Sequence, residues 1–399
     1  MKHSRSLARI AVPLLALLLA CLAPLVAAAQ TPAEQGAPLE PAPSFAIDAV
    51  SATLIEASTG RVIFAVNADE RRPVASITKL MTLLLTLEAL NAGAISLEDQ
   101  VLCSQRAGGM GGSQALLDAN QSYRLEDLLK SVIVASANDA AVALAEHIAG
   151  AEEVFVQRMN ARAQELGLEN TRYVNTTGLP AEGQYTTARD VAQLSRHLDA
   201  HPLYYRYSTL WLDTITHKGG RVTDLTNTNR LVRFYDDCDG YKTGSTNEAR
   251  YCLSATAKRG NLRLIAVVLG SSGSQARFDA ARQMLDYGFA NYQLVQVAKQ
   301  HERVGMQVAV RRGAQDGVDA VIGRDLAMLL RRGEEKDLRL EAVLPDSVTA
   351  PIRKGHPLGE ARVMRGDQEV ARLPLVAGQD VLLPGFLEGL LRILEGWRM

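Results

Sequence analysis

The stretch VASITKLMTLLLTLEAL, residues 74–90, is the most informative part of the chain. Its dense apolar residues predict a buried helix. Lys79 follows Ser76 by three positions, and residues at that spacing lie on one face of a helix, one turn apart. The sequence therefore brings an ammonium group to a hydroxyl group where an apolar helix begins.

Ser-x-x-Lys is a weak signal by itself, because a chain of 399 residues holds roughly one by chance. If the motif has no catalytic role, Ser76 caps the helix and Lys79 extends its charged end to solvent. Two further motifs favour chemistry: SAN at 136–138 lies between two predicted helices, and KTG at 242–244 lies before the last predicted strands of this region. The three motifs in this order indicate an active site with a serine nucleophile.

Strand and helix patterns around these motifs predict a mixed α/β (α+β) domain. Residues 50–69 hold two apolar runs around a Ser-Thr-Gly turn, which predicts a hairpin. Apolar runs at 251–257 and 262–270 predict two more strands, and amphipathic patterns predict helices within 125–150 and 275–292. Strands from both ends with helices between them predict one sheet with a helical cluster on it.

The pattern changes after residue 292 to short alternating segments separated by Gly, Asp and Pro. This predicts a small all-β domain over 292–379, without clustered nucleophiles or acids, which we expect to be a spacer or docking module. The whole chain is 47% hydrophobic and 22% charged, with a net charge of −1. These values are ordinary for a globular protein and give no indication of a nucleic-acid partner.

The N-terminus has the pattern of a secretory signal peptide over residues 1–29, with basic residues, an apolar run and an Ala-x-Ala site. A retained membrane anchor and a lipoprotein site at Cys21 are the alternatives. Residues 30–43, rich in Ala and Pro, predict a flexible linker, and the catalytic domain is expected over 44–291. We therefore expect an exported protein.

Three cysteines follow the predicted signal peptide: Cys103, Cys238 and Cys252. An odd number argues against a disulfide framework. Buried free thiols are expected, and a Cys238–Cys252 bridge is the alternative.

No metal or organic cofactor is expected. The chain has no H-E-x-x-H motif and no Walker or dinucleotide-binding glycine motif. His197 and His201 have the spacing of metal ligands, but no acidic or cysteine partner stands nearby, so we expect a frayed helix end before Pro202. The glycine-rich run GGMGG, residues 108–112, is expected to form a flexible loop near the cleft.

The residues around the motifs resemble the low-molecular-mass penicillin-binding proteins that act as serine D-Ala-D-Ala carboxypeptidases (peptidase family S11). The resemblance rests on ASITKLMT, IVASANDAAVALAEHIAG, LGLENTRYVNTTGL, NTNRL, DGYKTGST and RFDAARQMLDYGF, which lie between residues 48 and 292. It implies a β-lactamase/transpeptidase-like domain with an antiparallel sheet and a helical cluster. It also implies removal of the terminal D-alanine from the peptidoglycan stem pentapeptide, and covalent inhibition by β-lactams.

The chemistry of such an enzyme gives each motif a role. Ser76 must lose a proton to attack a peptide carbonyl, and Lys79 takes that proton only when neutral. Burial and a second cation at Lys242 both lower the pKa of Lys79. Ser136 is expected to relay a proton to the leaving nitrogen, and Asn138 to hold the substrate amide and position Lys79.

The resemblance adds an oxyanion hole and a carboxylate site. It implies that backbone N–H groups of Ser76 and Ser245 form the oxyanion hole, worth about 3 kcal/mol per donor. It also implies that Thr243 and Arg277 bind the free terminal carboxylate, for which a guanidinium fork is well suited. A surface ion pair is the alternative interpretation of Arg277, and Arg282 is the alternative carboxylate ligand.

The strand that carries KTG has further expected features. Gly244 is small, so we expect substrate to lie close along the strand. The chain has EAR at 248–250 where many relatives have Ala-Gly, and Thr228 where some have a basic residue. Both departures are expected to change substrate preference without removing a catalytic group.

Three other functions fit parts of the pattern. A class A β-lactamase needs an E-x-x-L-N glutamate, which is absent between Asn138 and Lys242. A D,D-endopeptidase that cuts peptidoglycan cross-links is closer, and the β-rich region and C-terminal helix argue against it. A catalytically silent peptidoglycan-binding scaffold would need a broken motif, and none is broken.

The C-terminal residues 380–399 predict an amphipathic helix with a single apolar stripe that includes Trp397. The run is too short and too charged to span a bilayer. We expect it to lie in the membrane plane, on the periplasmic face of the bacterial cytoplasmic membrane. Docking against the body of the protein is the alternative.

Overall fold

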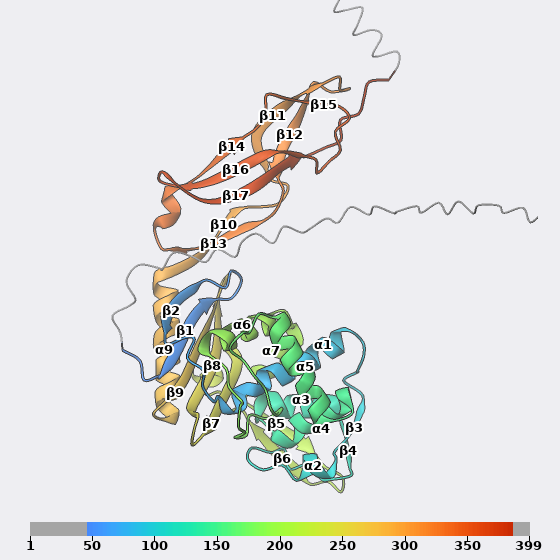
Figure 1. The fold of residues 1–399 in the computed structure, drawn as a ribbon, viewed down its shortest axis with the longest axis vertical. Coiled ribbons are helices and arrows are strands. Elements are labelled where there is room, and N and C mark those ends of the chain that lie inside the picture. The colour runs from blue at the N-terminus through green and yellow to red at the C-terminus, as the bar shows by residue number, and fades with distance from the viewer. Residues whose placement is uncertain (1–45, 386–399) are drawn as a thin grey trace, which may run out of the picture. The chain divides into compact units, whose positions relative to one another are not determined.

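The computed structural model describes residues 46–385. Up to Asn291, the described residues form one five-stranded sheet, two short hairpins and a set of helices (Figure 1). The strands of the sheet are β1 (Ser51–Glu56), β2 (Val62–Val66), β7 (Cys238–Thr246), β8 (Arg250–Arg259) and β9 (Leu262–Ser271). The hairpins pair β3 (Gln100–Leu102) with β4 (Ser122–Arg124), and β5 (Leu212–Thr216) with β6 (Val222–Thr226). The helices are η1 (Ala75–Thr78), α1 (Lys79–Asn91), α2 (Gln105–Gly108), α3 (Leu125–Val134), α4 (Asn138–Ala149), α5 (Glu152–Glu165), α6 (Ala188–Asp199), α7 (Pro202–Ser208), α8 (Leu231–Phe234) and α9 (Ser274–Asn291).

The sheet joins the two ends of this part of the chain. Its order is β2-β1-β9-β8-β7, and each neighbouring pair is antiparallel. The predicted hairpin around the Ser-Thr-Gly turn is β1–β2, and β9 lies against β1 from the far end of the domain. The prediction of an antiparallel sheet shared by both ends is confirmed.

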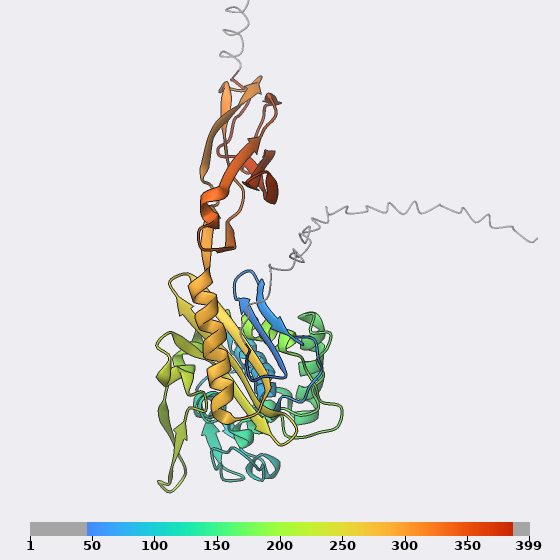
Figure 2. The same ribbon diagram turned by 90° about the vertical axis from the view of Figure 1, so that its left-hand side faces the viewer.

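Helices cover both faces of this sheet. Figure 2 shows α9 along one face, while the helical cluster with α1 and α6 lies on the other. All ten residues of β9 are buried, as expected for a strand with a helical layer on each side. A Cβ on Gly288 of α9 would lie 2.5 Å from Leu264 Cδ1, so this glycine lets α9 pack directly on the sheet.

The predicted apolar helix is α1, preceded by a short 3₁₀ turn. Ser76 lies in η1, and Lys79 is the first residue of α1. Most residues of α1 are buried, so the helix is apolar on nearly all sides and runs through the core. The chain therefore changes its helical geometry at the point where the serine meets the lysine.

From Tyr292 on, the described residues form only strands and one 3₁₀ turn. The elements are β10 (Tyr292–Ala298), β11 (Arg303–Arg311), β12 (Gly317–Ile322), β13 (Leu326–Arg331), η2 (Glu334–Asp337), β14 (Leu338–Val343), β15 (Ser347–Thr349), β16 (Pro357–Arg365) and β17 (Gln368–Ala377). β10 pairs with β13, and the others form a sheet of order β14-β16-β17-β12-β11-β15. The alternating residues of this region fill two small apolar clusters, so the all-β prediction is confirmed.

Several predictions concern residues outside 46–385. The signal peptide (1–29), the linker (30–43) and most of the C-terminal helix lie outside the described residues. Residues 380–385 are not helical, because Val381 bridges to Ile352 in extended conformation, so the predicted helix start is too early. Within 46–385, no helix is both long and apolar enough to cross a membrane.

Candidate active site

Ser76 lies on a turn that two other backbone segments hold tightly. Ala75 before it has a φ of +50°, a left-handed conformation that residues with a Cβ rarely adopt. A Cβ on Gly178, whose φ is +83°, would lie 1.9 Å from the Ala75 carbonyl oxygen. A Cβ on Gly244 would lie 2.5 Å from the Val74 carbonyl oxygen and 3.0 Å from the Ser76 nitrogen. Glycine is therefore required at both positions for the backbone to approach the serine turn.

The contact with the serine turn explains why position 244 is a glycine, and this explanation differs from the predicted one. Its missing side chain makes room for the serine turn, whereas we predicted room for substrate. Strand β7 consequently passes beside the Ser76 nitrogen, which brings KTG to the serine. The next residue, Ser245, lines a groove of about 590 Å³ together with Thr246, Asn247, Arg250, Tyr251 and Ser272.

Lys79 is fully buried and bonded to the serine. Its Nζ donates to Ser76 Oγ at 2.9 Å and to the Thr177 carbonyl oxygen at 2.7 Å. Burial, and next the nearby charge of Lys242, hold the pKa of Lys79 well below its ordinary value, although Asp139 opposes them. A neutral amine in hydrogen-bond contact with a hydroxyl is the arrangement that a general base requires.

Lys242 on β7 is also fully buried. Burial, and then the charge of Arg277, lower the pKa of Lys242 to about 7. Its Nζ makes a long contact of 3.4 Å to the Thr243 carbonyl oxygen. Lys242 thus acts on the base as predicted, because its charge contributes to keeping Lys79 neutral while Lys242 is protonated.

Ser136 and Asn138 lie at the break between α3 and α4, as the sequence predicts. Ser136 has a φ of +63°, and its buried Oγ has no hydrogen-bond partner in the described part of the chain. Such strain and an unpaired hydroxyl are costly, by about 1–3 kcal/mol each, and they concentrate at functional sites. Asn138 Nδ2 donates to the Gly111 carbonyl at 2.6 Å, while its Oδ1 has no partner within the described residues. The expected positioning of Lys79 by Asn138 is therefore not present.

The glycine-rich loop lies against Asn138. Besides the Gly111 bond, the Ser113 carbonyl accepts from the Asn138 backbone nitrogen at 2.7 Å. A Cβ on Gly112, whose φ is +79°, would lie 2.8 Å from Asn138 Nδ2. The loop therefore borders the site, and its glycines allow close approach of backbone.

Arg277 is buried and has no acidic partner within residues 46–385, so the surface ion pair is wrong. Its Nη1 donates to the carbonyl oxygens of Gly244 and Cys252 at 3.1 and 3.2 Å, and its Nε has no hydrogen-bond partner among the residues that the structure describes. Burial lowers its pKa to about 10. The guanidinium thus lies directly behind the KTG segment, and its Nε–H group remains available as a donor within the described structure. Arg282 is exposed and donates to the Phe234 carbonyl of α8 rather than to β7 or β8.

Thr177 is a site residue that the sequence analysis missed. It contributes its carbonyl oxygen, the second partner of Lys79. The only sequence signal was the turn Asn-Thr-Thr-Gly, where Asn175 Oδ1 accepts from the Thr177 and Gly178 nitrogens. Any residue type supplies a carbonyl, so the side chain at this position gives no indication of its role.

The histidine and cysteine predictions have clear outcomes. His201 is buried, and its Nδ1 bonds to Asn91 at 2.9 Å, so it is a packed residue rather than part of a frayed end. No group of metal-ligating side chains occurs within the residues described. Cys103, Cys238 and Cys252 are free, buried thiols, so the alternative bridge is wrong.

Two family models match separate parts of this chain. The family model of D-alanyl-D-alanine carboxypeptidases matches residues 36–273, and that of the penicillin-binding protein 5 C-terminal domain matches 292–382. D-alanyl-D-alanine carboxypeptidase DacF of Bacillus subtilis is 39% identical over 88% of this chain and 90% of its own. A D-alanyl-D-alanine endopeptidase of Escherichia coli is 34% identical over 58% of this chain and 74% of its own.

A solved structure has the same fold. Penicillin-binding protein 5 of Haemophilus influenzae superposes with a TM-score of 0.74 at 30% identity, covering 85% of this chain and 98% of that one. Fold and site together define a penicillin-binding serine enzyme. The chain belongs to the D-alanyl-D-alanine carboxypeptidase family, the S11 class of low-molecular-mass penicillin-binding proteins.

Replacing Lys242 is expected to move the pH dependence of acylation upward. If Lys79 is the base, the rate is expected to rise as Lys79 loses its proton, and the Lys242 charge lowers the pKa of Lys79. In Lys242→Gln that repulsion is absent, so the pKa of Lys79 rises and the rising limb shifts to higher pH. The measurement is the rate constant of fluorescent-penicillin labelling from about pH 5 to about pH 10. An unmoved limb would show that Lys242 does not influence the base.

Proposed function

We propose that this chain removes the terminal D-alanine of peptidoglycan pentapeptides through an acyl-enzyme on Ser76. The observation that carries the proposal is the 2.9 Å bond between Lys79 Nζ and Ser76 Oγ, made by a lysine that is fully buried. A lysine in that environment is held toward its neutral form and accepts the serine proton. The family membership supports the same reaction.

The reaction proceeds in two halves. Ser76 Oγ attacks the carbonyl carbon between the two D-alanines while Lys79 takes its proton. The tetrahedral intermediate collapses, the C–N bond breaks, and the leaving nitrogen receives a proton through Ser136. Water then attacks the ester, the serine oxygen regains its proton, and the shortened peptide leaves. Backbone N–H groups of Ser76 and Ser245 stabilise the oxyanion in both halves, at about 3 kcal/mol per donor.

The carboxylate of the terminal D-alanine is expected to bind where β7 meets Arg277. Thr243 supplies a hydroxyl, while Lys242 and Arg277 supply positive charge. Arg277 lies behind the strand and already donates to the Gly244 carbonyl. The cationic surroundings thus favour a substrate that ends in a free carboxylate, as a carboxypeptidase requires.

The nucleophile can be tested by mapping a trapped adduct. After reaction with benzylpenicillin and digestion with trypsin, the added mass should lie on the peptide of residues 72–79 and fragment to Ser76. The only other hydroxyl in that peptide is Thr78, which serves as the internal control. An adduct on Thr78 or on another peptide would exclude the proposed nucleophile.

The endopeptidase alternative has less support. The endopeptidase relative matches 58% of the chain, whereas carboxypeptidase relatives such as DacF match 88%. The chain also carries residues 292–382, which match the C-terminal domain model of a penicillin-binding protein. We therefore place D-alanine release first and cleavage of cross-links second.

Arg277→Ala is expected to weaken turnover of substrates with a free terminal carboxylate. Loss of a charge-assisted hydrogen bond costs about 1.5–3 kcal/mol, which corresponds to a fall in kcat/KM of about 10–100-fold. The control is the same peptide with a C-terminal amide, whose slower turnover should change little. Equal loss on both substrates would mean that Arg277 only braces the Gly244 and Cys252 carbonyls.

We also propose that the protein is exported and held at the periplasmic face of the cytoplasmic membrane by the C-terminal helix. The support is the signal-peptide pattern of residues 1–29 and the apolar stripe that ends near Trp397. Deleting residues 386–399 leaves all described elements in place. The truncated mature protein should move from the membrane fraction to the soluble periplasmic fraction with unchanged activity on soluble peptide. Full-length protein that is soluble without detergent, or a truncated protein that unfolds, would refute the anchor.

A further inference from the structure

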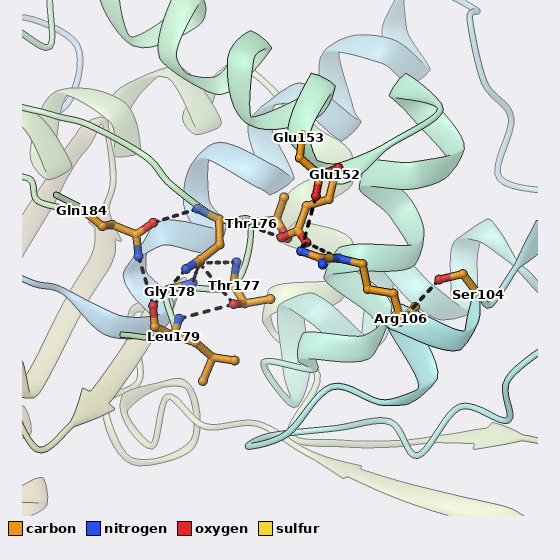
Figure 3. Close-up of polar contacts among 11 residues, drawn as sticks. Ser104, Arg106, Glu152, Glu153, Thr176, Thr177, Gly178, Leu179 and Gln184 are labelled. Carbon is orange, nitrogen blue, oxygen red and sulfur yellow. Dashed lines mark hydrogen bonds and ion pairs between the residues drawn. The ribbon is translucent and has the colours of Figure 1, made fainter. Parts of the chain in front are cut away.

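A buried carboxylate, Glu152, lies beneath the turn that carries the carbonyl partner of Lys79. It is the first residue of α5, and it is only 3% exposed. Figure 3 shows it between Arg106 and the Thr176–Thr177 turn, whereas the neighbouring Glu153 has a 72% exposed side chain. Glu152 makes no contact with Ser76 or Lys79 in the hydrogen bonds and ion pairs of the described residues, so any influence on them passes through the turn.

The position of Lys79 Nζ depends on that turn. Its two hydrogen-bond partners are Ser76 Oγ and the Thr177 carbonyl oxygen, at 2.9 and 2.7 Å. The serine oxygen must leave its position to attack substrate, so the carbonyl is the partner that stays in place. An error of about 1 Å in the position of a reacting group can cost about 10²-fold in rate.

Glu152 fixes the residue directly before Thr177. Its Oε1 accepts from the backbone nitrogen of Thr176 at 3.1 Å and from Thr176 Oγ1 at 2.8 Å. The Thr176 carbonyl in turn accepts from Thr82 Oγ1 on α1 at 2.8 Å. Three hydrogen bonds therefore hold Thr176 between α5 and α1. The next residue, Thr177, carries the carbonyl that accepts from Lys79.

The second carboxylate oxygen is held by Arg106. Arg106 donates to Glu152 Oε2 through Nε at 2.9 Å and through Nη2. The arginine comes from α2, whose last residue is Gly108, where the glycine-rich loop begins. That loop supplies the Gly111 carbonyl to Asn138. The Arg106–Glu152 ion pair thus links the turn that contacts Lys79 to the glycine-rich loop that contacts Asn138.

From this chain of contacts we infer that Glu152, oriented by Arg106, is a positioning residue for the general base of the reaction. It orients the Thr176–Thr177 turn so that the Thr177 carbonyl holds Lys79 Nζ against Ser76 Oγ. The inference rests on the proposed function, because it assumes that Lys79 is the base. Its effect is on the acylation step, and a purely structural role would leave that step unchanged in the folded protein.

The test compares substitutions that remove one contact each. Glu152→Ala removes both Thr176 bonds and the ion pair, and should slow penicillin labelling about 10²-fold. Glu152→Gln keeps an oxygen for Thr176 but turns an amide donor toward Arg106, and should give an intermediate loss. Thr176→Val removes only the hydroxyl bond and keeps the side-chain shape, and should slow labelling by a smaller factor. The first-order rate constant is compared only under conditions in which each variant is folded, because exchange with unfolded protein would also lower it.

The chain offers a matched control in a second ion pair that joins α5 to α1. Arg162 of α5 donates to Glu88 Oε1 of α1 through Nε at 3.1 Å and Nη2 at 2.8 Å, so this pair also joins two elements with a forked contact. Glu88 does not contact the Thr176–Thr177 turn through any hydrogen bond of the described residues. Glu88→Ala should therefore label at the wild-type rate, whatever its effect on thermal unfolding.

The pH profile gives a second readout. A carbonyl acceptor stabilises the ammonium form of Lys79 more than the neutral amine. When the Thr177 carbonyl moves away in Glu152→Ala, the pKa of Lys79 falls, and the rising limb of the labelling rate shifts to lower pH. This direction is opposite to that expected for Lys242→Gln, so loss of support and loss of the neighbouring charge are distinguishable.

The labelling rates and pH profiles of these variants decide whether Glu152 is a positioning residue. Slower labelling with the lower-pH limb in Glu152→Ala, together with normal labelling in Glu88→Ala, supports the inference. Wild-type labelling in Glu152→Ala, an unmoved limb, or equal slowing in both variants overturns it. If Glu152→Ala does not fold, Glu152→Gln and Thr176→Val decide by the same criteria. Wild-type protein that fails to label at all would refute the proposed function instead.

Discussion

Ser76→Ala protein is expected to show no covalent labelling by a fluorescent penicillin and no release of D-alanine from pentapeptide. The acyl-enzyme forms on Ser76 Oγ, and no other serine of the described residues is a hydrogen-bond partner of a buried lysine. Loss of a covalent nucleophile reduces the rate by at least about 10⁴-fold, which is below detection in a labelling gel. The measurements are in-gel fluorescence and D-alanine release on the same preparation.

The fold should tolerate this substitution. Ser76 Oγ has one hydrogen bond in the described structure, to Lys79, and the glycine contacts around the turn involve backbone atoms. The thermal midpoint of Ser76→Ala should therefore lie close to that of the wild type. Persistent labelling of the folded variant would show that another residue is the nucleophile.

Lys79→Met is expected to abolish acylation and to stabilise the protein. Removing the base should lower the labelling rate by about 10²–10⁴-fold. The methionine fills a similar volume but brings no charge into a fully buried site, so the desolvation cost of Lys79 is relieved. We expect a higher thermal midpoint together with a lost activity.

Penicillin labelling and thermal unfolding of the same variant test this pair of effects. Lys79→Ala serves as the packing control, because it also loses the base but leaves a cavity and should be less stable than Lys79→Met. Rapid labelling of Lys79→Met would show that Ser76 gives its proton to another group. A lower thermal midpoint for Lys79→Met would show that the buried amine stabilises the fold.

The sequence predicted the parts of the site that side chains identify. The spacing of Ser76 and Lys79 predicted their contact, although the turn between them is 3₁₀ rather than α-helical. The setting of Ser136 at a helix break followed from the pattern of its neighbours, and the sheet followed from apolar runs at both ends of the domain. Each of these features depends on residue type and on local periodicity, which a single sequence contains.

The parts that the sequence did not predict depend on backbone atoms brought together by the fold. Thr177 acts through a carbonyl, and Gly244 is small because the serine turn occupies the space beside it. Glu152 stands at the first position of a helix, where an acidic residue is common for reasons of the helix dipole alone. Its contact with Thr176 joins residues that are 24 positions apart, which no local pattern reveals.

Arg277 and His201 show the same limit for polar side chains. A surface ion pair was the alternative interpretation of Arg277, and His201 was expected at a frayed helix end, but both side chains are buried. The Arg277 guanidinium donates hydrogen bonds to carbonyl oxygens of two strands. The His201 ring forms a hydrogen bond with the side-chain amide of Asn91. Burial of a polar residue depends on which elements pack over it, and this information is not present in the spacing of a short motif.

The most direct test of the central claim is the ratio of two rates on one preparation of the mature enzyme. D-Alanine release from a soluble stem pentapeptide is compared with hydrolysis of a cross-linked dimer of the same stem. The carboxypeptidase account predicts rapid release of D-alanine, slow or absent cleavage of the dimer, and loss of both rates after treatment with benzylpenicillin. Faster cleavage of the dimer than of the pentapeptide would contradict the account and identify the protein as an endopeptidase.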